Sequence, residues 1–127
     1  MSGDGPRDYG RTYLRPLPVP LQLRFGVTTD RGDVRRFLVQ LEYWVGGEWQ
    51  EVVRYDHDPA APGEQAHDIT EQGLHVDIYR EGKKVRSERV SAPLPPDEGF
   101  DCAEEHLLER LEVTVRRFEE WHGIRSR

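Results

Sequence analysis

The chain has 127 residues, which is the size of a single domain, and its formal net charge is −6 with a charged fraction of 33%. This acidity argues against non-specific coating of DNA, because that function needs many Lys and Arg side chains to neutralise phosphates. The single cysteine, Cys102, excludes a framework of internal disulfides and favours a reducing compartment.

The first 17 residues are rich in Gly, Pro, Arg and Asp and lack the apolar core of a signal peptide. No later stretch has the length and apolarity of a transmembrane helix, so we expect a cytoplasmic protein without a membrane partner. Arg15–Pro20 reads RPLPVP and predicts extended chain, because proline lacks an N–H and restrains the preceding residue. We predict a flexible arm over residues 1–17 and one domain over residues 18–127.

Five strands are predicted from the alternation of apolar and polar residues. Their approximate ranges are 21–28, 35–45, 48–57, 74–80 and 83–90. Gly46-Gly47 and Glu81-Gly82 are typical of tight hairpins, and such short connections make neighbouring strands antiparallel. The fifth strand carries many charges, as expected of an edge strand that avoids pairing with other chains.

One C-terminal helix is predicted, beginning near Asp101 and ending near Trp121. Asp101 would be its N-cap, with Glu104 as the capping-box partner, and Gly123 would end it. Apolar residues recur in it at spacings of three and four and form a stripe that would cover the sheet. The predicted fold class is therefore α+β, an antiparallel meander of about five strands packed against one C-terminal helix.

Polar residues of the third and fourth predicted strands share one face if those strands pair. Because side chains alternate, Val52, Arg54 and Asp56 lie on one face of the third strand, and His75 and Asp77 lie on the polar face of the fourth. A rigid sheet with a polar loop at its end is a common way to hold reactive groups. The solvated face of a half-exposed sheet gives the same pattern, so a purely structural role is the alternative.

Three of the five histidines, His57, His67 and His75, lie on or beside the loop between these strands. Together with Asp77 they could supply ligands for zinc or manganese. The HExxH, CxxC and calcium-loop motifs are absent from the sequence. We therefore predict no cofactor and no metal ligands, with a divalent metal at these four residues as the minor alternative.

Metal-free acid–base chemistry is the leading interpretation of the same residues. Cleavage of RNA by its 2′-hydroxyl needs a base, an acid and a cation at the phosphate, and histidine can be either acid or base near neutral pH. Arg54 and Arg80 are the candidates for holding the phosphate. The candidate catalytic residues are Asp56, which would orient a histidine, and His57, His67 and His75.

The segment RYDHDPAAP, followed by two further histidines, resembles the TumE-type toxins of bacterial and archaeal toxin–antitoxin systems. Those proteins are similar in length and combine a short sheet, an R/K-aromatic-D-N-x-P-like segment, downstream histidines and C-terminal helix. The similarity spans about Leu38 to Arg80, although His57 stands where that family favours Asn and Ala60-Ala61 replaces a pair of histidines. The strand GLHVDIYR is also similar to one in uncharacterised small-domain families. The positions that match the toxin motif are Arg54, Tyr55, Asp56, Pro59, His67 and His75.

This resemblance implies a small toxin-like protein of a toxin–antitoxin or defence system that cleaves RNA. An alternative from another class is a non-enzymatic interaction module, antitoxin-like or regulatory. It would dock a cognate protein partner, or a second copy of itself, through the N-terminal arm or the charged edge strand. The clustered His and Asp residues favour the enzyme, and the acidic net charge favours the binding module.

Overall fold

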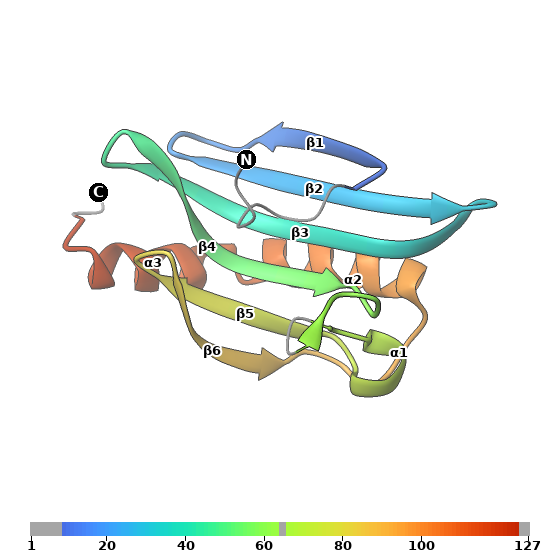
Figure 1. Ribbon diagram of the computed structural model, residues 1–127. Coiled ribbons are helices and arrows are strands. Elements are labelled where there is room, and N and C mark those ends of the chain that lie inside the picture. The colour runs from blue at the N-terminus through green and yellow to red at the C-terminus, as the bar shows by residue number, and fades with distance from the viewer. Residues whose placement is uncertain (1–8, 64–65, 125–127) are drawn as a thin grey trace.

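The computed structural model describes residues 9–63 and 66–124 and contains an antiparallel sheet of six strands, each paired with its neighbours in sequence (Figure 1). The predicted α+β class and the antiparallel meander are confirmed. The strands are β1 (Arg11–Pro16), β2 (Leu21–Asp30), β3 (Asp33–Val45), β4 (Glu48–His57), β5 (His75–Arg80) and β6 (Lys83–Arg89). The helices in the described residues are α1 (Ile69–Gln72), α2 (Pro96–Glu109) and α3 (Leu111–Trp121).

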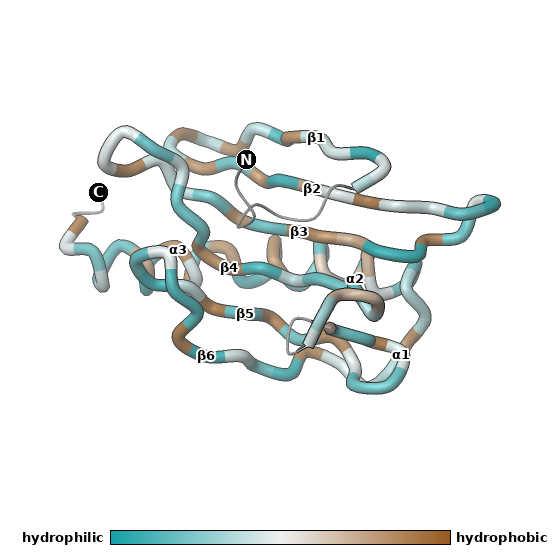
Figure 2. The backbone as a smooth tube through the Cα atoms, viewed as in Figure 1, coloured by the Kyte–Doolittle hydropathy of each residue, from teal (hydrophilic) through white to brown (hydrophobic). Residues whose placement is uncertain are grey.

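The hydrophobic core lies between the sheet and the two C-terminal helices. Alternate residues of the central strands point into it, among them Phe25, Phe37 and Leu41, and Leu107 of α2 and Phe118 of α3 meet them from the other side. Figure 2 shows the resulting alternation of hydrophobic and hydrophilic positions along the strands. Since full burial of one such side chain contributes about 1.5–3 kcal/mol, this layer holds the sheet against the helices.

A strand that the sequence did not predict forms one edge of the sheet. Residues 11–16, expected in a flexible arm, instead form β1 and pair with β2, from Arg11 opposite Val27 to Pro16 opposite Gln22. The ring of Tyr13 stacks on Phe25 with a centroid distance of 4.7 Å, which fastens an otherwise exposed strand. Residues 1–8 of the predicted arm lie outside the described residues.

A β-bulge changes the alternation in β4. The register with β3 shifts between Leu41 and Glu42, and Val52 is the extra residue opposite that step. Val52 is 2% exposed and belongs to the hydrophobic core. The expectation that Val52 shares a face with Arg54 and Asp56 is therefore wrong, because one inserted residue reverses the alternation.

The C-terminal helix differs from the prediction at its start and in its middle. It begins at Pro96, and its N-cap, Pro95, has no side-chain capping bond, so Asp101 lies inside α2 rather than at its start. Proline is favoured in the first turn because its fixed φ suits a helix and no N–H is lost there. Arg110, with φ −105° and ψ 15°, separates α2 from α3, so there are two helices rather than one. Gly123 follows α3 with a φ of 66°, as predicted for the stop.

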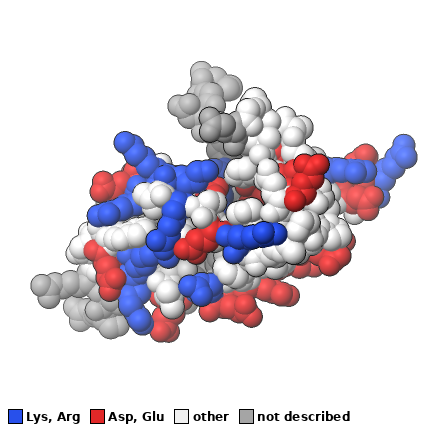
Figure 3. Space-filling view, turned by 90° about the horizontal axis from the view of Figure 1, so that it is seen from below, with Lys and Arg blue, Asp and Glu red and all other residues white. Residues whose placement is uncertain are grey.

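The opposite edge of the sheet is formed by β6, in which all seven residues are exposed. Figure 3 views the molecule from this side and shows basic side chains gathered over part of the surface, with acidic ones around them. The prediction of a charged strand at an edge is confirmed. No helix within the described residues has both the length and the apolarity needed to cross a membrane.

Candidate functional site

A cavity of about 270 Å³ opens on the face of the sheet that the C-terminal helices leave free. Its polar lining comes from five segments: the end of β4, the loop before α1, the end of α1, the start of β5, and β6. The lining residues are Asp56, His67, Ile69, Gln72, Gly73, His75 and Ser87. Three of the four predicted catalytic residues, Asp56, His67 and His75, are thus brought together.

His67 and Asp56 form a hydrogen-bonded pair in this cavity. The distance from His67 Nδ1 to Asp56 Oδ1 is 2.5 Å, and the side chains are 27% and 17% exposed. The backbone of His67 is fixed by an antiparallel bridge to Asp58, with N···O distances of 2.8 and 3.2 Å. The hydrogen bond to the Asp56 carboxylate raises the pKa of His67, although burial acts in the opposite direction. The pair therefore has the geometry of an oriented acid–base group.

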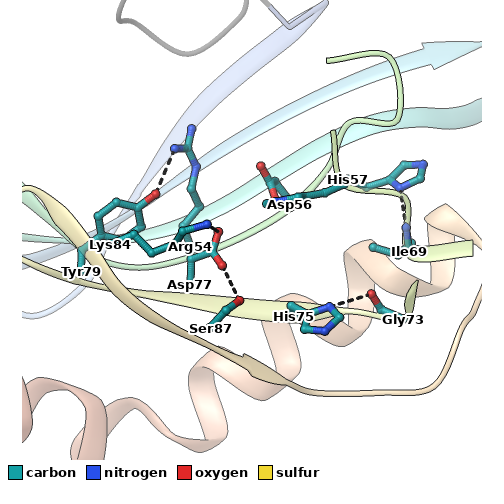
Figure 4. Close-up of polar contacts among 11 residues, drawn as sticks. Arg54, Asp56, His57, Ile69, Gly73, His75, Asp77, Tyr79, Lys84 and Ser87 are labelled. Carbon is teal, nitrogen blue, oxygen red and sulfur yellow. Dashed lines mark hydrogen bonds and ion pairs between the residues drawn. The ribbon is translucent and has the colours of Figure 1, made fainter. Parts of the chain in front are cut away.

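His75 is oriented by the backbone instead of by a carboxylate. Its Nδ1 lies 3.2 Å from the carbonyl oxygen of Gly73 and donates to it, which leaves the lone pair of the neutral ring on Nε2 (Figure 4). Gly73 has a φ of 81°, and a Cβ at this position would lie 2.1 Å from the Ser91 carbonyl oxygen. Only glycine allows this turn, so the position of His75 depends on it.

His57 does not take part in the cavity. Its side chain is on the core side of the sheet, where the ring lies 5.9 Å from that of Phe37 and the residue is 3% exposed. The Ile69 N–H donates to His57 Nδ1 at 3.2 Å, so this histidine ties α1 to the end of β4 (Figure 4). Burial lowers the pKa of His57, and acceptance of the Ile69 N–H requires an unprotonated Nδ1. This arrangement gives His57 a structural role rather than the catalytic role expected of it.

The two predicted phosphate ligands lie in different places. Arg54 is directly opposite Asp77 across β4 and β5 and donates to the Tyr79 hydroxyl at 3.5 Å. Its buried Nε has no hydrogen-bond partner among the residues that the structure describes. Arg80 is at the far end of β5, about 16 Å along the strand from His75, and its guanidinium lies over the Trp121 ring. Arg54 is therefore beside the cavity, and Arg80 is not.

Asp77 joins the His67–Asp56 pair to form a group of three residues that could each supply a metal ligand. One ligand atom each from Asp56, His67 and Asp77 lies within 4.8 Å of the others. Two carboxylates and one imidazole suit zinc or manganese. In the structure Asp77 accepts from Ser87 Oγ at 2.6 Å and lies 3.9 Å from Lys84 Nζ (Figure 4). The four-residue set expected from the sequence is not assembled, because His57 lies on the other face of the sheet.

A second polar cluster, missed in the sequence, continues this face onto β2 and β3. Glu42 is 5% exposed and accepts hydrogen bonds from Gln22, Arg24 and Gln40 at 2.6–2.8 Å. Burial acts to raise the pKa of Glu42, but these hydrogen bonds outweigh it and lower the pKa. Each of these residues falls on the polar side of a predicted strand, so alternation and register together could have found the cluster.

Comparison with known proteins adds one finding. Neither the curated proteins nor the solved structures gave a match. A family model does match residues 6–124, a range that includes all six strands and the three helices described above. The family found is not the TumE-type toxin family but the second kind expected, an uncharacterised small domain. The chain therefore belongs to the family described as domain of unknown function DUF7718.

Proposed function

We propose that this protein is a small toxin-like enzyme that cleaves RNA by acid–base catalysis without a metal. The observation that supports this proposal is that two imidazoles, His67 and His75, line one cavity with their Nδ1 atoms already engaged. Engagement of Nδ1 orients each ring and leaves Nε2 for proton transfer. A histidine that only stabilises the fold, such as His57, is instead buried against the core.

Each group in the cavity has a definable role in this reaction. His75, with a lone pair on Nε2, takes the proton from the 2′-hydroxyl as its oxygen attacks the phosphorus. His67, which Asp56 favours in the protonated form, gives a proton to the leaving 5′-oxygen as the P–O bond breaks. The products are a 2′,3′-cyclic phosphate and a free 5′-hydroxyl. Arg54, which lies beside the cavity opposite Asp77, stabilises the charged phosphate.

Cleavage of labelled RNA in the presence of EDTA tests the proposal. Single-stranded oligonucleotides and folded RNAs, each with a 5′-fluorescent label, are incubated with the protein, and the new ends are analysed for cyclic phosphate. His67→Gln and His75→Gln should each lower the rate by a factor of about 100 or more, in the range expected for loss of an acid or base. His122→Gln is the matched control, because His122 follows α3 directly and its ring bonds the Phe118 carbonyl at the end of that helix.

Three results would reject this function. The first is the absence of cleavage by the wild-type protein on every RNA offered. The second is an equal rate in the wild type, His67→Gln and His75→Gln. The third is cleavage that requires Zn²⁺ or Mn²⁺, which would instead favour metal chemistry at Asp56, His67 and Asp77.

The exposure of all of β6 favours a second candidate, a non-enzymatic module that pairs with a cognate protein or with another copy of itself. An unpaired edge strand offers its backbone groups to an added strand. Val85, in the middle of β6, is 48% exposed. Val85→Pro would distort the backbone of this edge strand and should abolish association measured by sedimentation, while Val85→Thr should keep it. A wild-type protein that sediments as a monomer alone and with candidate partners would reject this candidate.

A further inference from the structure

A second hollow lies on the helix side of the β5–β6 half of the sheet, where α2 meets α3. Its floor is apolar and includes Tyr55 and Ile78, and its polar lining comes from β6 and the helices. This hollow is separate from the cavity, because neighbouring residues of β6 point to opposite sides of the sheet. Arg86 is opposite Ile78 on the helix side, and Ser87 is opposite Asp77 on the cavity side. The polar residues that line the hollow are Glu88, His106, Arg110, Thr114 and Arg117.

Positive charge is concentrated here in a chain whose net charge is negative. Arg117 lies close enough to Arg86 and Arg110 that, after burial, their charges are the main influences that lower its pKa. The acidic residue that faces them, Glu88, is already bound to Arg86 at 3.1 Å. Arg110 and Arg117 have no carboxylate partner within the described part of the chain. Gathering like charges costs free energy unless an anion compensates them, so this cluster is a candidate anion site.

The groups around the hollow are held in place before any ligand arrives. The guanidinium of Arg117 lies 5.4 Å from the centroid of the Trp121 ring, a cation–π contact that limits its motion. His106 Nδ1 lies 2.7 Å from the Tyr55 hydroxyl, and burial lowers the pKa of His106. In the neutral ring that accepts from Tyr55, the proton is on Nε2, which makes it a hydrogen-bond donor for an anion.

We propose that Arg86, Arg110 and Arg117, the arginine groove, bind the phosphates of an RNA strand that crosses the edge strand β6 and reaches the cavity on the other face. The choice of RNA rests on the proposed function, whereas the site itself rests on the charges and contacts described above. Guanidinium groups match phosphate oxygens with paired hydrogen bonds, so three neighbouring arginines suit the repeated phosphates of a nucleic-acid backbone. Since every residue of β6 is exposed, no element in the described part of the chain covers this path for an extended strand.

Binding is measured apart from cleavage, with a fluorescent 2′-O-methyl RNA oligonucleotide that lacks the attacking hydroxyl. Wild-type protein should bind it with an affinity that falls as salt rises, because each neutralised phosphate releases counterions. The double variant Arg110→Glu/Arg117→Glu should weaken binding at least tenfold and reduce the slope of log affinity against log salt by about 2. The matched control Arg35→Glu/Arg116→Glu makes the same change of charge at two exposed arginines outside the groove.

The outcomes separate this inference from the proposed function. Equal weakening by the two double variants, or no binding by the wild type, overturns the groove even if RNA is cleaved. Displacement of the oligonucleotide by polyglutamate at equal charge concentration also overturns it, in favour of an acidic protein partner. His67→Gln should bind the oligonucleotide as the wild type does. If the wild-type protein binds RNA but never cleaves it, the arginine groove is supported and the proposed enzymatic function is rejected. If the glutamate variant is unfolded by circular dichroism, Arg110→Gln/Arg117→Gln replaces it, with an expected loss of at least threefold.

Discussion

The two faces of the sheet show different ways of burying residues. The face under α2 and α3 is closed by apolar contacts, with Phe37 and Leu41 completely buried. The opposite face buries Glu42 and Asp77 almost as deeply, but each of these carboxylates has hydrogen-bond donors around it. Apolar burial is non-directional, whereas a buried carboxylate is tolerated only with its partners in place. On the polar face, stability therefore depends on the exact placement of individual hydrogen-bonding atoms, which a reactive site also requires.

The largest effect is expected from the apolar face. Phe37→Ala removes a fully buried ring that contacts Phe100 and His57, and it should lower the free energy of unfolding by about 3–5 kcal/mol. Denaturant unfolding measures this change. Phe37→Leu is the matched control and should cost clearly less, since most of the volume is kept. A loss below about 1 kcal/mol would mean that the helices do not hold this face closed.

On the polar face, Glu42→Ala should cost about 2–3 kcal/mol. The change leaves the amides of Gln22 and Gln40 and the guanidinium of Arg24 without their shared acceptor. Glu42→Gln keeps one acceptor oxygen and should cost less in the same unfolding experiment. Equal stability of Glu42→Ala and the wild type would show that the network contributes nothing net.

The turn before β5 should connect stability with the site. Gly73→Ala places a Cβ against the Ser91 carbonyl at a φ of 81°, so we expect a loss of about 1–3 kcal/mol together with a displaced His75. The RNA-cleavage rate should fall by more than the unfolded fraction explains. Gly82→Ala is the matched control, because Gly82 has a similar φ of 78° and a Cβ there would meet no atom of the described residues within 4 Å. Identical cleavage rates in the two variants would show that the turn at Gly73 does not determine the position of His75.

The smallest effect is a dependence of stability on pH. Hydrogen bonds lower the pKa of Glu42 in the folded protein, so the unfolded chain binds more protons as the solution becomes acidic. The stabilisation from Glu42 is present above the ordinary carboxyl pKa of 4.5 and is lost as the pH falls from there through the lower folded value. Glu42→Gln should show a shallower loss of stability below this pH than the wild type. Parallel curves for the two proteins would contradict the prediction.

Alternation alone was enough to predict most of the sheet. The five predicted strands correspond, in chain order, to β2, β3, β4, β5 and β6. Alternation failed for β1, because its apolar residues Tyr13 and Leu14 are adjacent and so do not share a face. It also failed at Val52, because a bulge depends on how the strands fit and not on either strand alone.

The candidate site was predicted only in part for the same reason. Asp56 and His75 follow from alternation, but the approach of His67 to Asp56 depends on the Asp58 bridge, which residue spacing does not reveal. His57 was misplaced in the loop. It has the same parity as Tyr55, and alternation carried one residue further would have put it on the core side.

The bulge at Val52 also divides β4 into two stretches that pair with β3 in different registers. A one-residue insertion or deletion in a regular strand transmits through the ladder and turns every following side chain over. In β4 the irregular step at Val52 offers a place where such a change can be absorbed. We therefore expect a one-residue change in the Gly46-Gly47 hairpin to be absorbed at Val52, with Arg54 still opposite Gln40 and Asp56 still opposite Leu38.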